Sequence, residues 1–500
     1  MTPSLTDVRA RTSSLLSFTG RYRTLHLTWF AFFLSFVVWF DFAPFASTIQ
    51  DQLGLTSDQI KVIGLANVAL TVPARVAIGM VLDRFGPRRV YGAILIFAVV
   101  PNTLFALAPS FGMLVLSRLA LSVVGAGFVV GIRMVSEWFP PSEVGTAEGV
   151  YGGWGNFGSA AAAFSLPVLA GFVGGADGWR WAIGSVGVVA ALYGVVYLRA
   201  VTDTPPGVVY VRPHRQGALE VTSRAGVFLL AALTIPVNAV IALIAWRVWR
   251  VGVISDSAFT VVLVVTLVLL VVQEITVFRV NRPALAGGYR SDDQYPTRSV
   301  AALCLAYFAA FGSELAVVTM LPGFFAGTWG LGPALAGIAA SGFAFMNLVS
   351  RPAGGMLSDI TGSRRRTLTV LLGGLGLGYA LMSTLGSAWP WVLAVAATML
   401  CSVFVQAAEG ATYAIVPLVK RRVSGQISGL VGAYGNIGAV TFLTARLFVS
   451  DTVFFLLVAA SAMVAVASMR FLVEPAAHEA PVLALDHEAI ESDPAVEQVA

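Results

Sequence analysis

Long apolar runs of similar length are the feature that most restricts how this chain can fold. About fourteen of them occur, and each approaches the roughly 20 residues that a helix needs to cross a bilayer. The chain is 57% hydrophobic and 11% charged, whereas soluble proteins are about 25% charged. Because a backbone in lipid must satisfy its own hydrogen bonds, these runs predict helices. We therefore expect an all-α polytopic membrane protein.

The runs fall into two sets of six, separated by an additional pair. We expect the first set near residues 26–48, 61–82, 92–109, 112–138, 148–172 and 181–199. We expect the second set near residues 299–323, 333–357, 368–388, 391–418, 426–449 and 452–472. The additional pair, 225–246 and 258–278, should span as a hairpin because both runs reach bilayer length. The alternative is that neither run spans, since one extra crossing would invert the second set.

Basic residues gather in loops that join alternate helices, as at 83–91, 364–366 and 420–422. Cytoplasmic loops of membrane proteins carry an excess of Lys and Arg, so both termini should be cytoplasmic in a cell (plasma or inner) membrane. The expected parts are a cytoplasmic N-terminal segment at 1–24, a six-helix half at 25–200, a linker with two extra transmembrane helices at 201–298, a second six-helix half at 299–473, and a disordered acidic cytoplasmic tail at 474–500.

An internal repeat relates the two halves. The stretch Arg75–Arg89 reads RVAIGMVLDRFGPRR, and Arg351–Arg365 reads RPAGGMLSDITGSRR. The two align without a gap, so Arg75 corresponds to Arg351 and Asp83 to Asp359. Half-molecules repeated in this way are typical of alternating-access transporters, whose substrate binds between the halves.

Each copy of the repeat carries one arginine inside an apolar helix. Arg75 and Arg351 precede a boundary Asp by about eight residues, or ~12 Å of helix, which is close to the middle of a bilayer about 30 Å thick. Arginines at such depth mark functional sites, so we expect an anion site between the halves. The alternatives are snorkelling to the interface and structural pairing with buried carboxylates.

A second repeated motif is rich in glycine. Residues 149–158 read GVYGGWGNFG, and residues 429–438 read GLVGAYGNIG. Glycines spaced by three or four residues allow helices to approach closely. Asn156 and Asn436 at the same place in each copy offer amide donors to an oxyanion. Alternatively, both asparagines bond a neighbouring helix across a packing seam.

Together with the stretch EGATYAIVP at Glu409–Pro417, these motifs resemble the nitrate/nitrite porters of the major facilitator superfamily. The resemblance covers both six-helix halves. It implies the major facilitator fold and a cavity where Arg75 and Arg351 clamp nitrate while Asn156 donates to it. Aromatic side chains of the family stack on the anion, and the matching positions here are Tyr307, Phe311, Phe36 and Phe128. For each ring taken singly, ordinary helix packing is the alternative.

Three carboxylates lie within apolar runs: Asp41, Glu314 and Glu409. Intramembrane carboxylates mark proton relays by default, so uptake of nitrate or nitrite coupled to protons is the expected function. Structural pairing with an arginine is the alternative for Asp41 and Glu314. Counterflow of nitrite for nitrate, which needs no titrating group, is the alternative for coupling.

Other functional classes fit the chain less well. We find no metal-ligand spacing, no cofactor motif and no Ser/His/Asp set, so we expect no enzyme and no cofactor. The basic residues lie in short loops, which argues against nucleic acid, and the partners expected are nitrate or nitrite, protons and lipid, for a monomeric protein. A porter for another small or organic anion, or a nitrate sensor whose output is the acidic tail, remain alternatives.

Overall fold

The computed structural model describes residues 14–290 and 293–475. Residues 1–13 and 476–500, which include most of the predicted acidic tail, lie outside the described part of the chain. The first six expected spans are built from nine α-helices. They are α2 (Gly20–Phe40), α3 (Ala46–Leu53), α4 (Ser57–Ala69), α5 (Thr71–Phe85), α6 (Pro87–Ala106), α7 (Phe111–Leu121), α8 (Gly127–Trp138), α9 (Val144–Val173) and α10 (Gly178–Ala200).

The additional pair and the second set of six follow along the chain. The pair and a short helix after it are α11 (Arg224–Arg250), α12 (Asp256–Val280) and α13 (Arg282–Ala286). The second set comprises α14 (Thr297–Trp329), α15 (Pro333–Phe345), α16 (Asn347–Ile360), α17 (Arg364–Met382), α18 (Trp391–Tyr413), α19 (Ser424–Ala445) and α20 (Asp451–Ser468). The all-α fold class expected from the apolar runs is confirmed.

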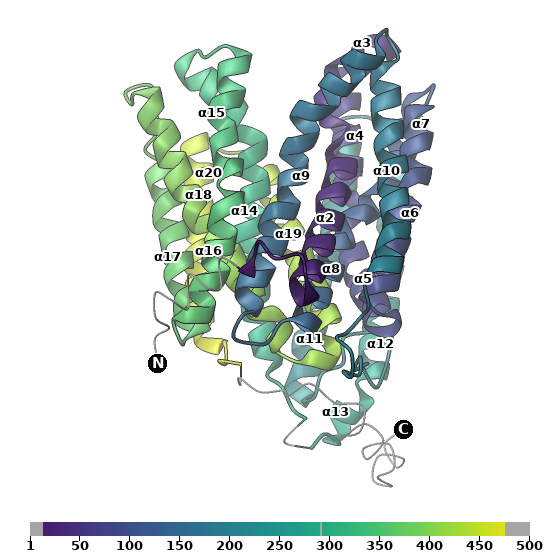
Figure 1. Ribbon diagram of the computed structural model, residues 1–500. Coiled ribbons are helices and arrows are strands. Elements are labelled where there is room, and N and C mark those ends of the chain that lie inside the picture. The colour runs from purple at the N-terminus through teal and green to yellow at the C-terminus, as the bar shows by residue number, and fades with distance from the viewer. Residues whose placement is uncertain (1–13, 291–292, 476–500) are drawn as a thin grey trace.

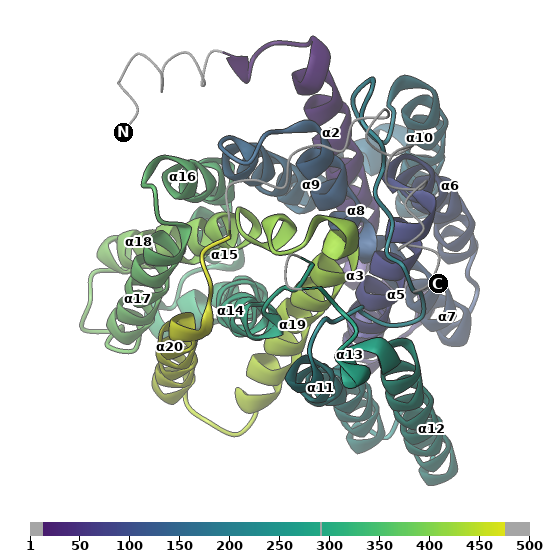
Figure 2. The same ribbon diagram turned by 90° about the horizontal axis from the view of Figure 1, so that it is seen from below.

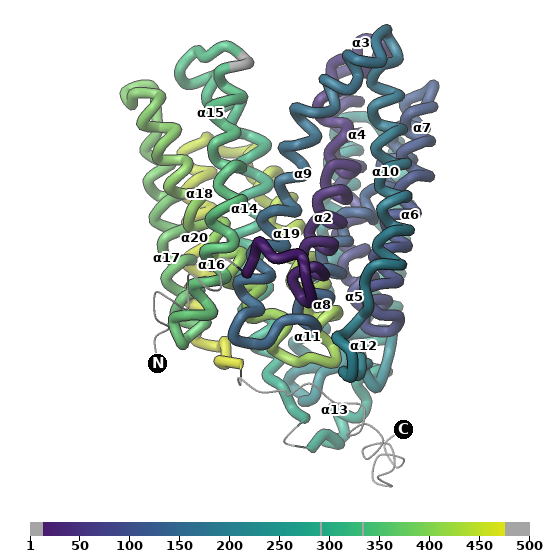
Figure 3. The backbone as a smooth tube through the Cα atoms, in the orientation of Figure 1, coloured from purple at the N-terminus to yellow at the C-terminus, as the bar shows by residue number. Residues whose placement is uncertain are grey.

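Two bundles stand side by side, α2–α10 in one and α14–α20 in the other (Figure 1). Their helices approach one another at the end near α13 and diverge toward the end that carries α3, as the backbone trace also shows (Figure 3). We call these the α13 end and the α3 end. The hairpin of α11 and α12 packs beside α19, outside the two bundles (Figure 2).

Twelve helical segments of the described chain are long and apolar enough to cross a membrane, α11 and α12 among them. The other two expected spans are not among these twelve. One is the α15–α16 pair, which carries Arg351 and Asp359, and the other is α17, which starts at Arg364 in the Arg-Arg-Arg loop. The basic start of α17 lowers its hydropathy, as is expected where a helix begins in a cytoplasmic loop.

Several expected helices differ from the observed ones in detail. The helix expected at 61–82 is broken at Leu70, three residues before Pro73, which lacks the N–H that would bond the preceding turn. The helix expected at 333–357 is broken at Met346. The one expected at 368–388 ends at Met382. Breaks at Leu70 and Met346 occupy the same position relative to Arg75 and Arg351 in the repeat.

The repeated glycine helices cross from one bundle to the other. A Cβ placed on Gly149 of α9 would lie 2.7 Å from the carbonyl oxygen of Arg351 on α16, and one on Gly429 of α19 would lie 2.4 Å from that of Arg75 on α5. A side chain at either position would therefore separate the backbones. Each glycine helix thus packs on the arginine helix of the opposite half, and the two crossings obey the same internal symmetry.

The linker on either side of the hairpin is anchored to the C-terminal half by Arg422. This guanidinium lies 3.2 Å from the carboxylate of Glu220, which is fully buried and also accepts from the Tyr289 hydroxyl. It also pairs with Asp293. Burial opposes ionisation of Asp293, but Arg422 and Lys420 hold the pKa of Asp293 below its usual value. This ionic contribution is therefore complete at neutral pH and is lost as pH falls through the lowered pKa.

Replacing Arg422 by methionine should lower the midpoint of thermal unfolding in detergent strongly. The substitution leaves the Glu220 carboxylate buried without its cation, which costs about 3–5 kcal/mol, and adding Glu220→Gln should restore much of the loss. Arg446→Met is the matched control, because its pair with Asp451 is a third or more exposed and such pairs contribute about 1 kcal/mol or less. Equal, small effects of Arg422→Met and Arg446→Met would show that the linker anchor does not depend on this ion pair.

Candidate functional site

The two repeat-related arginines meet at the centre of the molecule. Arg75 lies in the second turn of α5 and Arg351 in the second turn of α16. Their side chains are 0% and 1% exposed. Snorkelling to the membrane interface is therefore wrong for both residues.

One aromatic ring joins the two guanidinium groups. The Cζ atom of Arg75 lies 5.4 Å from the ring centroid of Phe128 on α8, and that of Arg351 lies 5.3 Å from the same centroid. Arg75 is also 5.2 Å from the ring of Phe311, on which Tyr307 stacks at 5.0 Å. Such contacts favour a desolvated cation. Three of the four aromatic residues expected at the site thus surround both arginines.

The two arginines differ in their polar partners. Arg351 lies 2.6 Å from the carboxylate of Glu409 on α18, and it donates to the Tyr307 hydroxyl at 3.2 Å. Arg75 donates at 2.8 Å to the carbonyl oxygen of Gly432 across the interface between the halves. Its Nε is buried without a hydrogen-bond partner, and the described residues provide it with no ion pair. The structural-pair alternative thus applies to Arg351 and leaves Arg75 as a buried cation without a counter-ion.

The two motif asparagines take different positions. Asn436 on α19 donates at 3.2 Å to the carbonyl oxygen of Gly432, the oxygen that also accepts from Arg75. Asn436 is therefore joined to the arginine through a shared acceptor. Asn156, the corresponding residue of α9, is 6% exposed, one helical turn beyond Gly152.

Gly152 adjoins the other arginine. A Cβ placed on Gly152 would lie 2.5 Å from the Nε of Arg351. This glycine therefore leaves the space that the guanidinium occupies.

Two expected residues lie away from the arginines. Phe36 packs on Phe32 at 4.5 Å, and Phe32 in turn lies 5.2 Å from Phe128. Phe36 is therefore one ring removed from the site. Asp41 forms a fully buried ion pair with Arg118 at 2.6 Å within the N-terminal half. This contact agrees with the alternative that Asp41 pairs structurally with an arginine.

The other two candidate carboxylates lie together beside Arg351. Glu314 accepts a hydrogen bond from the side-chain amide of Asn347, and Glu409 pairs with Arg351. All four residues belong to the C-terminal half. This part of the site therefore brings two buried carboxyl groups close to one arginine.

Comparisons with known proteins agree with this geometry. The sequence profile of the Major Facilitator Superfamily matches residues 28–288 and 303–493. A nitrate/nitrite transporter, NrtP of Picosynechococcus sp., is 51% identical over 461 residues, which cover 87% of this chain and 86% of the relative. This chain belongs to the nitrate/nitrite porter family of the Major Facilitator Superfamily. It is therefore a member of a family of transporters, and not of enzymes.

Further relatives and solved structures are similar to this porter. NrtP of Nostoc punctiforme is 47% identical over 476 residues, 93% of this chain and 95% of the relative. High-affinity nitrate transporter 2.3 of Oryza sativa subsp. japonica is 29% identical over 90% of this chain and 76% of the relative. Among solved structures, the transporter FucP in the outward conformation has a TM-score of 0.62 at 14% identity, covering 90% of this chain and 98% of that one. The proton:xylose symporter XylE has a TM-score of 0.61 at 13% identity, covering 94% and 98%. At such identities these structures show the fold alone.

The porter is closed at its α13 end. Asp83 of α5 accepts backbone hydrogen bonds from Gly425 and Gln426 at the start of α19, at 3.0 and 2.9 Å. Asp359 of α16 does the same at the start of α9, at 3.0 and 2.6 Å. A carboxylate at a helix N-terminus is favoured by the unpaired N–H groups and the helix dipole. The two boundary Asp residues of the repeat therefore fasten each half to the other.

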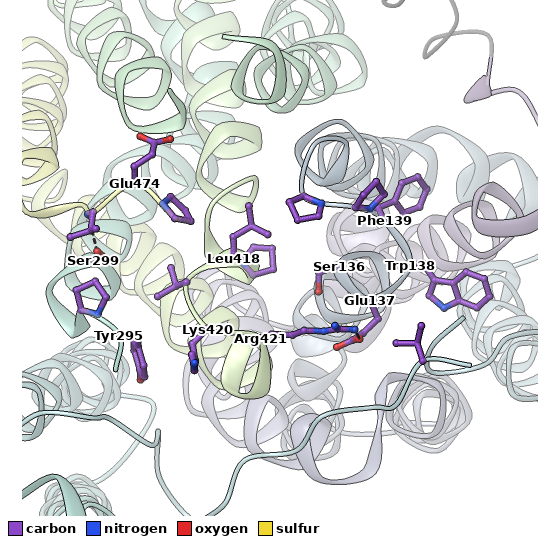
Figure 4. A pocket seen from close by; sticks show the side chains of 18 of the residues that line it. Ser136, Glu137, Trp138, Phe139, Tyr295, Ser299, Leu418, Lys420, Arg421 and Glu474 are labelled. Carbon is purple, nitrogen blue, oxygen red and sulfur yellow. Dashed lines mark hydrogen bonds and ion pairs between the residues drawn. The ribbon is translucent and has the colours of Figure 1, made fainter. Parts of the chain in front are cut away.

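A cavity of about 650 Å³ lies outside this closure, between the two halves at the α13 end (Figure 4). Its wall includes Glu137 of α8, which pairs with Arg421 at 2.5 Å across the interface. Arg133 pairs with Glu137 at 2.8 Å and also contacts Ser424 at the start of α19. In the described part of the chain, hydrogen bonds between the halves lie at the level of the arginines or nearer the α13 end.

Two residues at the porter's centre were not expected from the sequence. Tyr413 packs edge-on to Phe128 at 4.8 Å and to Tyr307 at 4.9 Å. It lies one helical turn after Glu409 in α18, so spacing along the helix could have found it. Glu148 of α9 is 1% exposed. It directly precedes the repeated glycine motif, and because it is not itself repeated, the comparison of the two motifs does not identify it.

Substituting Gly152 by alanine should destabilise this porter, because the added methyl would push against Arg351, which is fixed between Glu409, Tyr307 and Phe128. Overpacking of this kind costs about 1–3 kcal/mol. Gly171→Ala in the same helix is the control, since nothing lies within 4 Å of its added Cβ. The midpoint of thermal unfolding in detergent should fall only for Gly152→Ala, and an unchanged midpoint would mean that α9 does not confine the guanidinium.

Proposed function

We propose that this porter moves nitrate and/or nitrite across the plasma membrane by alternating access, with the anion bound between Arg75 and Arg351. The observation that carries the proposal is the arrangement of two repeat-related guanidinium groups on one phenylalanine ring, of which only Arg351 has a carboxylate partner. The names of the relatives that are 51% and 47% identical support the same substrates.

Electrostatics favours a small planar anion at this place. A guanidinium is permanently charged and planar, and its fork matches a planar oxyanion in bidentate fashion. An isolated buried charge is costly, so the Arg75 cation is stabilised when a monovalent anion enters. The rings of Phe128 and Phe311 provide flat apolar surfaces beside it.

The asymmetric closure supports alternating access. Asp83, Asp359 and the Glu137–Arg421 pair fasten the α13 end, while the helices diverge toward the α3 end (Figure 1). Because the basic loops gather at the α13 end, we assign that end to the cytoplasm. In this state the anion would enter from the outside. Breaking the two Asp contacts would then open the path inward.

Net uptake needs a second ion. Moving a monovalent anion inward against a negative-inside potential costs about 2.3 kcal/mol per 100 mV. One accompanying proton makes the cargo neutral, so we favour nitrate/H⁺ symport in which a buried carboxyl group near the arginines binds the proton. Exchange of nitrite for nitrate is the second candidate. A bulky organic anion is the weaker alternative, because aromatic rings pack closely against both buried arginines.

Arg75→Lys and Arg351→Lys should each weaken nitrate binding at least tenfold, since an ammonium loses the planar fork and a charge-assisted hydrogen bond contributes about 1.5–3 kcal/mol. Calorimetric titration of purified protein with nitrate, and uptake into proteoliposomes, measure the effect. Arg180→Lys is the control, because Arg180 pairs with Asp177 outside the site. Retention of wild-type nitrate affinity in either site variant would contradict the clamp.

An inside-alkaline pH gradient should drive nitrate accumulation in proteoliposomes, and a protonophore should abolish it. Under symport, uptake of labelled nitrate continues without internal nitrite. Under exchange, uptake requires internal nitrite and ignores the gradient. Flux without any pH dependence in wild type and in Glu314→Gln would eliminate the proton-coupled form of the proposal.

A further inference from the structure

A carboxylate outside the pair beside Arg351 has no partner. Glu148 of α9 is 1% exposed, and both of its oxygens are buried without a hydrogen-bond partner among the described residues. An ionised carboxylate is not stable in such a place unless it is paired. In the closed interface Glu148 is therefore either a neutral acid or the counter-ion of a nearby cation.

Arg351 is the cation that the packing of α9 on α16 places beside Glu148. Glu148 lies one helical turn from Gly152, on the same face of α9, and Gly152 adjoins the Nε of Arg351. Helices α9 and α16 lie side by side where the two halves meet (Figure 2). Glu148 therefore belongs to one half, and the arginine that attracts it belongs to the other.

Apart from the exposed Arg23 of α2 and Arg199 of α10, the remaining charged groups on the helices packed against α9 have their own partners. Asp359 of α16 accepts from the start of α9, and Glu409 of α18 pairs with Arg351. In α8, Arg133 and Glu137 pair with each other, and on α2 Arg21 pairs with Glu143. The nearest titratable group on α9 itself is Tyr151, whose hydroxyl donates to the carbonyl oxygen of Phe128. Arg351 is thus the group available to an ionised Glu148.

Glu314 and Glu409 differ from Glu148 because their partners lie in their own half of the molecule. Their partners, Asn347 and Arg351, lie in the same half, so a rigid movement of the halves keeps these contacts. Glu148 changes its surroundings in the same movement, because opening the α13 end takes α9 away from α16 and admits water.

Charge balance links Glu148 to the anion. Glu409 neutralises Arg351, whereas Arg75 has no carboxylate partner among the described residues, so the two arginines leave one positive charge in the closed interface. Either a bound nitrate or an ionised Glu148 neutralises that charge, but both together leave one negative charge in excess. A dry interface penalises any such excess.

We propose that Glu148 binds the coupled proton and acts as the internal counter-ion of the empty site, so that nitrate and the Glu148 proton enter the closed interface together. This inference rests on the proposed function. A hydronium ion on the α3 side transfers a proton to a Glu148 oxygen as nitrate binds, so one O–H bond of hydronium breaks, one forms on the carboxyl group, and water is left. When the α13 end opens, water there takes the same proton, nitrate leaves, and the carboxylate turns to Arg351.

The test is nitrate binding to purified protein as a function of pH, measured by calorimetry. In wild type the Kd should rise by up to about tenfold per pH unit above the range in which Glu148 holds its proton. Glu148→Gln mimics the neutral acid, so its Kd should be independent of pH and should match the wild-type value at low pH. Glu148→Ala should flatten the profile in the same way.

Glu274→Gln is the matched control. Glu274 is an intramembrane carboxylate of α12 that accepts from Thr234 in the inserted hairpin, and its variant should follow the wild-type pH profile. In proteoliposomes Glu148→Gln should exchange nitrate at the wild-type rate while losing accumulation driven by a pH gradient, since its empty site keeps an uncompensated charge.

Each outcome decides the question. A wild type that binds no nitrate at any pH would overturn the proposed function. A wild type that binds nitrate with a constant Kd, or a Glu148→Gln variant with the wild-type slope, would overturn this inference and leave the proposed function standing. Loss of nitrate binding in both neutral variants would also overturn it, because the inference requires a neutral side chain at position 148 to support binding.

Discussion

The structure depends on two fixed positive charges that share a dry interface between half-molecules. Phe128 contacts both guanidinium groups, and Glu409 neutralises only one of them. The charge that this leaves at Arg75 is costly in a dry interface until an anion compensates it. Under the two proposals, that anion is nitrate in the loaded porter and the Glu148 carboxylate in the empty one.

The repeated glycines make such an interface geometrically possible. Gly149 lies against the backbone of Arg351, and Gly429 against that of Arg75. Because each glycine helix crosses to the other half, moving one half moves both the arginine it carries and the surface on which the partner's arginine rests. Asp83 and Asp359 fasten the same two crossings one to two turns nearer the α13 end. A single rocking motion can therefore break the Asp83 and Asp359 contacts together.

Much of this arrangement is predictable from the sequence, because bilayer length and a gapless repeat are local properties. The repeat predicted the central arginines, and the family resemblance predicted Phe128, Tyr307 and Phe311 around them. Neither the repeat nor the resemblance shows which half each glycine helix packs against. Nor do they show that Arg351 pairs with Glu409 while Arg75 has no such partner among the described residues. Both features depend on contacts between distant segments of the chain. Asp41 illustrates the limit: a carboxylate in an apolar run looks functional until Arg118 is found beside it.

The departures from the repeat explain how a symmetric scaffold can have a direction. Ser428 precedes the second glycine motif at the position where Glu148 precedes the first. At this position, therefore, α9 carries an ionisable group in its crossing on α16, whereas α19 carries none in its crossing on α5. Backbone symmetry gives both crossings the same movement. Under the proposed coupling the proton binds at Glu148, and the equivalent position of the second half, Ser428, provides no matching carboxyl group.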